Sequence, residues 1–322
     1  MNVTGGFKQL MKHSASRVLL LVACAALAGV SVAQTQDKPK PQSSDTTQIG
    51  VLEVRLPISV KEKNRFIAGL KEFNFRVYED GQRQRIERFV APSQLPLNVA
   101  LLMDTSGSVK LKLPFEKAAA EDFVATVTTY RRKDRVLFVT FDSDVELHQD
   151  FTDSQELLIR AIKKVKAEGY TKMYDAVHRV IEEKMATLTG PDARRIIVIL
   201  SDGEDTASEH TLKEVIEMAQ RYDVTIFGIS TKNFTGITSG TVMNADDKHL
   251  RELCEETGGQ LFLPSQKVEL FKAFTEVALD LRQEYVVFYT PQNQAKNGRR
   301  RKIEVKLVAA DGQLYHKQGY VY

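Results

Sequence analysis

The central part of this sequence predicts a doubly wound α/β domain with a mostly parallel sheet, and three features support that prediction. Residues 97–280 alternate between strand-like and helix-like segments. Strand-like segments such as 135–141 and 195–200 are nearly continuous apolar runs, which is typical of strands buried on both faces of a parallel sheet. Oxygen-rich segments follow two of these strands, at the end where open parallel sheets bind ligands.

The expected elements follow one another along the chain. Strands are expected at 97–103, 135–141, 195–200, 223–229 and 260–263. Helices are expected at 115–130, 154–167, 173–188, 211–221, 246–257 and 266–282. The stretch 230–244 is longer than most connections in such folds and leaves the carboxyl end of a strand. We therefore hypothesise that it helps to choose a partner, with a flexible surface loop as the alternative.

Both flanks of this α/β segment are strand-like. Residues 48–94 contain an alternating segment at 73–78, followed by an Asp-Gly turn, which together predict a hairpin. Residues 283–322 contain further strand-like segments separated by Asn-Gly and Asp-Gly turns. Neither flank can easily bury a core alone. We expect the two flanks to pair as one small β-sandwich, with residues 95–282 inserted between its halves.

The first residues are typical of a secretory signal. Three basic residues precede an uncharged apolar run, 18–33, which ends in small residues. That run is shorter than the roughly 20 apolar residues that a membrane-spanning helix needs. We expect residues 1–33 to be cleaved and the protein to be exported, to the periplasm or the extracellular space. Residues 34–47 are polar and contain proline, which predicts a disordered linker.

Two alternatives remain open for this N-terminal segment. Leu21-Val22-Ala23-Cys24 is similar to the lipobox of bacterial lipoproteins, in which the cysteine carries the lipid. Against lipidation, an apolar run follows Cys24, where lipoproteins usually turn polar. The second alternative is an uncleaved N-terminal anchor. Membrane attachment is expected only through this segment or through lipidation at Cys24.

Charge and cysteine content argue against a nucleic-acid partner and against an internal disulfide. Residues 1–33 carry three positive charges and no carboxylates, so their removal lowers the formal net charge from +3 to 0. Nothing global then argues for a nucleic-acid partner. Cys254 becomes the only cysteine, which excludes an internal disulfide, and its surroundings predict a small buried apolar residue.

Three segments carry the oxygen-rich side chains. The first is Asp104-Thr105-Ser106-Gly107-Ser108, the second contains Thr171 before an expected helix, and the third is Ser201-Asp202-Gly203. Carboxylates, hydroxyls and water are the ligands that a hard divalent cation prefers, and Mg²⁺ takes about six oxygens. Taken alone, each segment also fits an ordinary turn or a helix cap.

The three segments together, in this order, resemble the metal-ion-dependent adhesion site of the von Willebrand factor type A domain. The resemblance rests on Asp-x-Ser-x-Ser, on threonine in a Gly-x-Thr-x-x-Tyr-Asp-Ala setting, and on Ser-Asp-Gly, and it covers roughly residues 95–282. It implies a Rossmann-like fold. It also implies the metal-site residues Asp104, Ser106, Ser108, Thr171 and Asp202.

The resemblance further implies a role for each residue. Ser106 and Ser108 would bind the metal directly, and Thr171 would bind it directly or through water. Asp104 and Asp202 would act mainly through bound waters. In the family, a carboxylate from a protein partner often completes the coordination.

Two further features bear on this resemblance. The segment 73–89 and the terminal Gly319-Tyr320 are similar to segments of bacterial secreted VWFA-related proteins. Tyr170 departs from the family pattern, because many members have a small residue before the threonine. Its ring would narrow access to the metal or contact a ligand.

These observations lead to one expected function and its alternatives. We expect an exported, non-enzymatic binding or adhesion module that uses a divalent cation to hold an acidic group on a protein partner. Mg²⁺ is the expected cation, with Mn²⁺ or Ca²⁺ as alternatives. The first alternative is a metal-independent scaffold for envelope assembly. The second, metal-assisted phosphoryl transfer or hydrolysis, lacks a Gly-x-x-x-x-Gly-Lys phosphate loop and a Gly-x-Ser-x-Gly nucleophile elbow.

Overall fold

The computed structural model describes residues 53–321, with gaps at 64, 92–95, 130–132, 189–193, 204 and 233–244. Residues Gly50–Tyr322 belong to one unit. The expected signal, the expected linker and most of the stretch 230–244 lie outside the described residues. Within the described part of the chain, no helix is long and apolar enough to cross a membrane.

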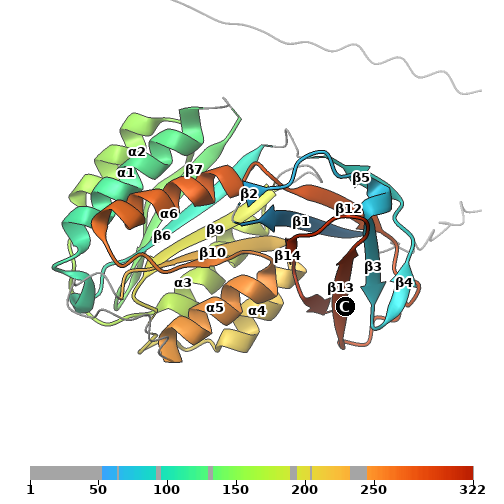
Figure 1. Cartoon of the computed structure of the whole chain (residues 1–322). Coiled ribbons are helices and arrows are strands. Elements are labelled where there is room, and N and C mark those ends of the chain that lie inside the picture. Colours follow the sequence, from blue (N-terminus) through green and yellow to red (C-terminus); the bar gives the residue numbers. More distant parts are fainter. Residues whose placement is uncertain are drawn as a thin grey trace, which may run out of the picture. The chain divides into compact units, whose positions relative to one another are not determined.

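A six-stranded sheet forms the centre of the α/β segment, in the order β11-β10-β9-β6-β7-β8 (Figure 1). Its parallel strands are β6 (Leu97–Asp104), β7 (Arg135–Phe141), β9 (Arg194–Ser201), β10 (Val224–Ser230) and β11 (Leu261–Phe262). The edge strand β8 (Val145–Thr152) pairs antiparallel with β7. The predicted mostly parallel, doubly wound sheet is confirmed.

Helices cover both faces of this sheet, as Figure 1 shows. The helices are α1 (Leu113–Thr129), α2 (Gln155–Lys164), α3 (Met173–Val180), α4 (Leu212–Arg221), α5 (Ala245–Thr257) and α6 (Lys267–Asp280). A 3₁₀ turn, η2 (Gly107–Val109), precedes α1, and a π-helical turn, η3 (Ile181–Met185), extends α3. Helices α1, α2 and α6 pack on one face, and α3, α4 and α5 pack on the other.

The apolar run of β6 explains why the sheet is covered twice. Val99, Leu101 and Met103 point into the core beneath α1 and α6, whereas Ala100 and Leu102 point into the core beneath α3 and α4. All five side chains are fully buried. An alternating sequence would have left one face polar, so the continuous run requires helices on both sides.

Two smaller antiparallel sheets are built from the flanks. One has the order β14-β1-β12-β5, with β2 paired to β1, and the other has the order β15-β13-β3-β4. The N-terminal flank supplies β1 (Val54–Glu62), β2 (Arg65–Phe66), a 3₁₀ turn η1 (Glu72–Asn74), β3 (Phe75–Glu79), β4 (Gln82–Gln84) and β5 (Arg88–Val90). The C-terminal flank supplies β12 (Tyr285–Tyr289), β13 (Arg300–Leu307), β14 (Gln313–Tyr315) and β15 (Gly319–Val321).

Strands from the two flanks pair with each other. β1 pairs with β12, and β3 pairs with β13, so each sheet takes strands from both ends of the described chain. The two sheets share one core, which includes Leu56 and Ile58 from the first flank and Tyr285 from the second. Neither flank could bury these side chains alone, because each contributes only part of each sheet.

Ion pairs join the flanking sheets to the α/β segment. Arg55 of β1 contacts Asp223 at the start of β10 at 2.6 Å, and Lys317 contacts the same carboxylate at 3.0 Å. Buried Arg194 of β9 pairs with Glu284, which directly precedes β12. An ion pair that is removed from water is favourable only when its geometry compensates for the lost hydration. These contacts therefore favour one relative placement of the flanking sheets and the α/β segment.

Candidate metal centre

The residues expected at the metal site lie at the carboxyl end of the central sheet. Asp104 is the last residue of β6, and Asp202 directly follows β9, the neighbouring strand. Asp104, Ser106, Thr171 and Asp202 are all buried, whereas Ser108 is exposed. The cluster therefore opens to solvent on the side of Ser108.

The carboxylate of Asp104 connects the loops that follow β6 and β9. One oxygen, Oδ1, accepts a hydrogen bond from the backbone N–H of Ser106 at 2.8 Å. The other, Oδ2, accepts one from the hydroxyl of Ser201 at 2.7 Å. The Ser201 hydroxyl in turn accepts from the backbone N–H of Gly203 at 3.1 Å. Asp104 thus sets the position of the segment that carries Asp202.

The two serine hydroxyls of the first segment lie side by side. Ser106 Oγ and Ser108 Oγ are 2.9 Å apart. Two ligands at right angles on a cation, each at about 2.0–2.1 Å as Mg²⁺ requires, would be about 2.9 Å from each other. The spacing of these hydroxyls therefore fits two neighbouring positions of an octahedral site.

The loop that carries Thr171 is fastened to the Asp104 loop by its backbone. Gly107 N–H donates to the carbonyl of Gly169 at 3.1 Å, and Glu168 N–H donates to the carbonyl of Thr105 at 2.7 Å. Gly169 has φ +88°, and a Cβ there would lie 2.6 Å from the hydroxyl of Ser143. Only glycine fits this position without strain, because L side chains rarely adopt such a φ.

A second loop supports Thr171 from the other side. The backbone N–H groups of Thr206 and Ala207 donate to the carbonyl of Thr171 at 3.0 and 3.1 Å. The Thr171 N–H donates back to the hydroxyl of Thr206 at 3.2 Å. The segment after β9 therefore positions both Asp202 and Thr171.

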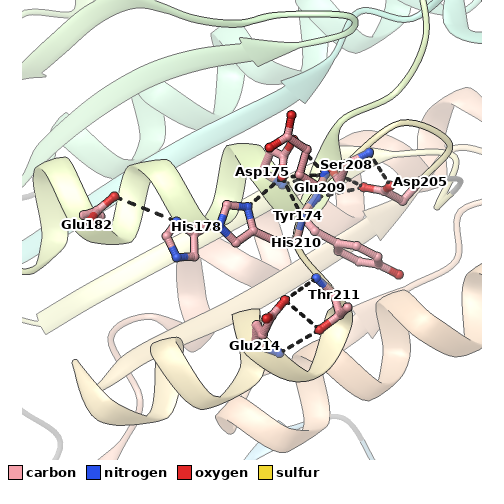
Figure 2. Close-up of polar contacts among 10 residues, drawn as sticks. All are labelled: Tyr174, Asp175, His178, Glu182, Asp205, Ser208, Glu209, His210, Thr211 and Glu214. Atoms are coloured by element: carbon pink, nitrogen blue, oxygen red, sulfur yellow. Dashed lines mark hydrogen bonds and ion pairs between the residues drawn. The ribbon is translucent and has the colours of Figure 1, made fainter.

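Asp175 organises that segment, as Figure 2 shows. Its carboxylate accepts hydrogen bonds from the backbone N–H groups of Glu209 and His210, both at 3.0 Å, and is 2.7 Å from Nδ1 of His210. Burial alone would raise the pKa of Asp175, but the hydrogen bonds from His210 and Glu209 lower it. Asp175 therefore supports this loop through its hydrogen bonds.

The site is electronegative. Burial raises the pKa of Asp104 to about 6 and nearby Asp202 adds to the rise, although hydrogen bonds from Ser201 and Ser106 oppose it. Two neighbouring buried carboxyl groups favour a cation between or beside them. Within the described residues no three His, Cys, Asp or Glu side chains are arranged to hold a metal. A cation here would therefore take most of its ligands from hydroxyls and water.

Exposed apolar side chains follow or precede the site residues. Leu111, three residues after Ser108, is 88% exposed, and Tyr170, directly before Thr171, is 71% exposed. The ring of Tyr170 thus extends into solvent, while its backbone N–H is held by the hydroxyl of Ser143 at 3.0 Å.

Sequence reasoning missed one carboxyl group near the site. Glu116 lies in the first turn of α1 and is 1% exposed. Burial raises its pKa to about 8, and the charges of Asp104 and Asp202 contribute. Acidic residues are common in the first turn of a helix because they interact favourably with its dipole, so the sequence carried no signal that Glu116 is unusual.

The sheet and its two helical layers define a doubly wound α/β domain with an oxygen-rich cluster at the strand ends. Residues 98–277 match the family model of the von Willebrand factor type A domain. The chain belongs to this family.

Two mouse proteins are related in sequence. Integrin alpha-M of Mus musculus is 28% identical over 145 residues, which cover 42% of this chain and 12% of that protein. Inter-alpha-trypsin inhibitor heavy chain H2 of Mus musculus is 25% identical over 240 residues, which cover 70% of this chain and 23% of that protein. The chain therefore spans less than a quarter of the length of either relative.

Solved structures with similar folds include bacterial pilus proteins. The vWF domain of the type V pili tip protein Mfa5 from Porphyromonas gingivalis has a TM-score of 0.45 and 14% identity, covering 58% of this chain and 95% of that one. The PilB minor pilin from Streptococcus sanguinis has a TM-score of 0.46 and 15% identity, covering 59% and 62%.

Proposed function

We propose that this protein is an exported, non-enzymatic binding module that uses a divalent cation to engage an acidic group on a protein partner. The observation that carries the proposal is the convergence of the Ser106 and Ser108 hydroxyls, 2.9 Å apart, beside the buried carboxylate of Asp104. Membership of the von Willebrand factor type A family supports it.

Five side chains would hold the cation. Ser106 and Ser108 would bind through their hydroxyls, and Thr171 would bind directly or through water. Asp104 and Asp202 would act mainly through bound waters. When bound, the cation supplies a Lewis-acid position for a carboxylate oxygen. Mg²⁺ is the proposed cation, with Mn²⁺ or Ca²⁺ as alternatives.

Exposure around the site supports a protein partner. Ser108 is the exposed member of the set, so a partner's carboxylate would approach from its side. Leu111 and Tyr170 offer exposed apolar surface, the first lying three residues after Ser108 and the second directly before Thr171. Aromatic side chains are enriched at protein interfaces because they combine a large apolar area with a polar group.

Export is proposed from the N-terminal segment, with lipidation at Cys24 as the alternative. The pattern of residues 1–33 supports a periplasmic or extracellular location.

Two observations bear on the alternatives. The Ser106 hydroxyl is hydrogen-bonded to Ser108 rather than to a base, which favours binding over nucleophilic catalysis. Both oxygens of Asp104 already accept protein hydrogen bonds, so the loops of the site support one another through the protein alone. This second observation favours the metal-independent scaffold as the alternative function.

Thermal unfolding of the purified protein tests the proposal. We expect Mg²⁺ or Mn²⁺ to raise the melting temperature saturably relative to EDTA, since a ligand at 100 times its Kd stabilises the native state by about 2.7 kcal/mol. Ser108→Ala is the sharpest variant, because Ser108 is exposed; in EDTA it should lower the unfolding temperature only slightly, through the lost hydrogen bond to Ser106. A native protein that binds no divalent cation would shift support to the scaffold.

A further inference from the structure

Glu116 is a buried carboxyl group without a hydrogen-bond partner. It is 1% exposed, and neither of its carboxyl oxygens makes a hydrogen bond within the described part of the chain. Thr231 is also fully buried, and its hydroxyl oxygen Oγ1 makes no hydrogen bond in good geometry among the described residues. Buried polar groups in native proteins are nearly always hydrogen-bonded, so two such groups together indicate a missing partner.

These two side chains are neighbours. The hydroxyl of Thr231 lies close enough to Glu116 to lower the pKa of that carboxyl as a hydrogen bond does, although their oxygen atoms do not meet in hydrogen-bonding geometry. They come from different elements, since Glu116 belongs to α1 and Thr231 directly follows β10. A water molecule between them would satisfy both, because water can donate to the carboxyl group and to the hydroxyl oxygen at once.

The same two side chains border the candidate metal centre. Thr231 N–H donates to the carbonyl of Ser201 at 2.8 Å, and the hydroxyl of Ser201 donates to Asp104 at 2.7 Å. The charges of Asp104 and Asp202 both act on Glu116. Lys112 also acts on Glu116 electrostatically, yet it donates no hydrogen bond to either oxygen. Glu116 is therefore linked to Asp104 electrostatically, and Thr231 is linked to it through Ser201.

We propose that Glu116 is a further carboxyl group of the cation site, which accepts a hydrogen bond from a water of the bound cation, with Thr231 as the second contact of that water. This inference rests on the proposed function, because it needs a cation at Asp104 and Ser106. Glu116 is a positioning residue: it orients the hydration shell without touching the metal. Residues in such outer positions typically change metal affinity 10- to 100-fold when they are replaced.

Isothermal titration with Mg²⁺ and Mn²⁺ tests the inference. The proteins compared are the native chain, Glu116→Gln, Thr231→Val and Asp122→Asn. Asp122 is an exposed carboxylate on the same helix and serves as the matched control for replacing a carboxyl group by its amide. We expect Glu116→Gln to weaken Mg²⁺ binding at least 10-fold, Thr231→Val to weaken it by a smaller factor, and Asp122→Asn to leave it unchanged.

The melting temperature in EDTA separates this role from a structural one. We expect Glu116→Gln to melt in EDTA at or above the native temperature, because an amide is cheaper to bury than an unpartnered acid. If the native protein binds Mg²⁺ and Glu116→Gln binds it with the same affinity, the inference is overturned and the proposed function still stands. A native protein that binds neither cation would overturn both. If Glu116→Gln does not fold, Thr231→Val decides: weakened binding supports the inference and unchanged binding overturns it.

Discussion

Replacing Asp223 by asparagine should weaken the attachment of the flanking sheets to the α/β segment. Asp223 accepts from Arg55 of β1 at 2.6 Å and from Lys317 at 3.0 Å, and its side chain is only 20% exposed. It also has φ +55°, a region that asparagine tolerates well, so Asp223→Asn removes the charge without adding backbone strain.

The magnitude follows from the two cations that would lose their partner. Arg55 and Lys317 are 13% and 8% exposed, and Nε and Nη2 of Arg55 already lack hydrogen bonds within the described residues. Breaking a fully buried ion pair costs about 3–5 kcal/mol. Because this cluster retains some contact with water, we expect a loss of about 2–4 kcal/mol in the free energy of unfolding at pH 7.

The effect should depend on pH with a definite sign. Burial alone would raise the pKa of Asp223, but the charges of Lys317 and Arg55 and their hydrogen bonds hold it well below its usual range. In the unfolded chain the pKa of an aspartate is about 3.9. The stability from Asp223 is therefore present above about pH 4 and is lost as pH falls below it toward the lower folded-state pKa.

Urea unfolding at several pH values, followed by circular dichroism, checks this reasoning. The native protein and Asp223→Asn should differ most at pH 7 and progressively less below pH 4. A difference under about 0.5 kcal/mol at pH 7 would show that the pair behaves as an exposed surface contact. A difference that stays constant down to pH 3 would refute the assignment of the effect to the Asp223 charge.

Three further predictions concern the site and the core. Gly169→Ala should lower the free energy of unfolding by about 1–3 kcal/mol and weaken Mg²⁺ binding, because φ +88° is unfavourable for alanine and its Cβ would clash with Ser143. Urea unfolding and calorimetric titration measure the two effects. Unchanged stability would contradict the predicted backbone strain. Ser108→Ala should lower Mg²⁺ affinity strongly and the melting temperature in EDTA only slightly, through the lost hydrogen bond to Ser106; calorimetry and melting curves measure the two effects. Burial raises the pKa of the Cys254 thiol, so a thiol reagent at pH 8 should label it only after unfolding. Rapid labelling of the folded protein would contradict this prediction and would show that α5 exposes Cys254 by local unfolding.

Most of the central sheet could be predicted from local pattern, but one strand could not. The continuous apolar runs of β6, β7, β9 and β10 indicated burial on both faces, and the structure confirms it. The edge strand β8 was missing from the expected elements. It is polar and partly exposed along most of its length, so its sequence resembles a loop until pairing with β7 satisfies its backbone.

The candidate site also contains residues that are close in sequence and residues that only the sheet brings together. Asp104, Ser106 and Ser108 are close in sequence, so their meeting followed from one short loop at a strand end. Bringing Asp202 beside them required β9 to be the neighbour of β6, an order that the predicted parallel sheet did not specify and that the structure shows. The assignment of a cation to these residues stays a prediction.

The sequence by itself determined the α/β class, the burial of the central strands and the oxygen-rich loops at their ends, because each depends on periodicity or spacing within a few residues. Only the tertiary structure decided which strands of the two flanks pair and that Glu116 lies beside Thr231 near Asp104. The strand pairings and the contact between Glu116 and Thr231 join residues more than 100 positions apart, and local pattern records how a residue is buried but not which distant residue it meets.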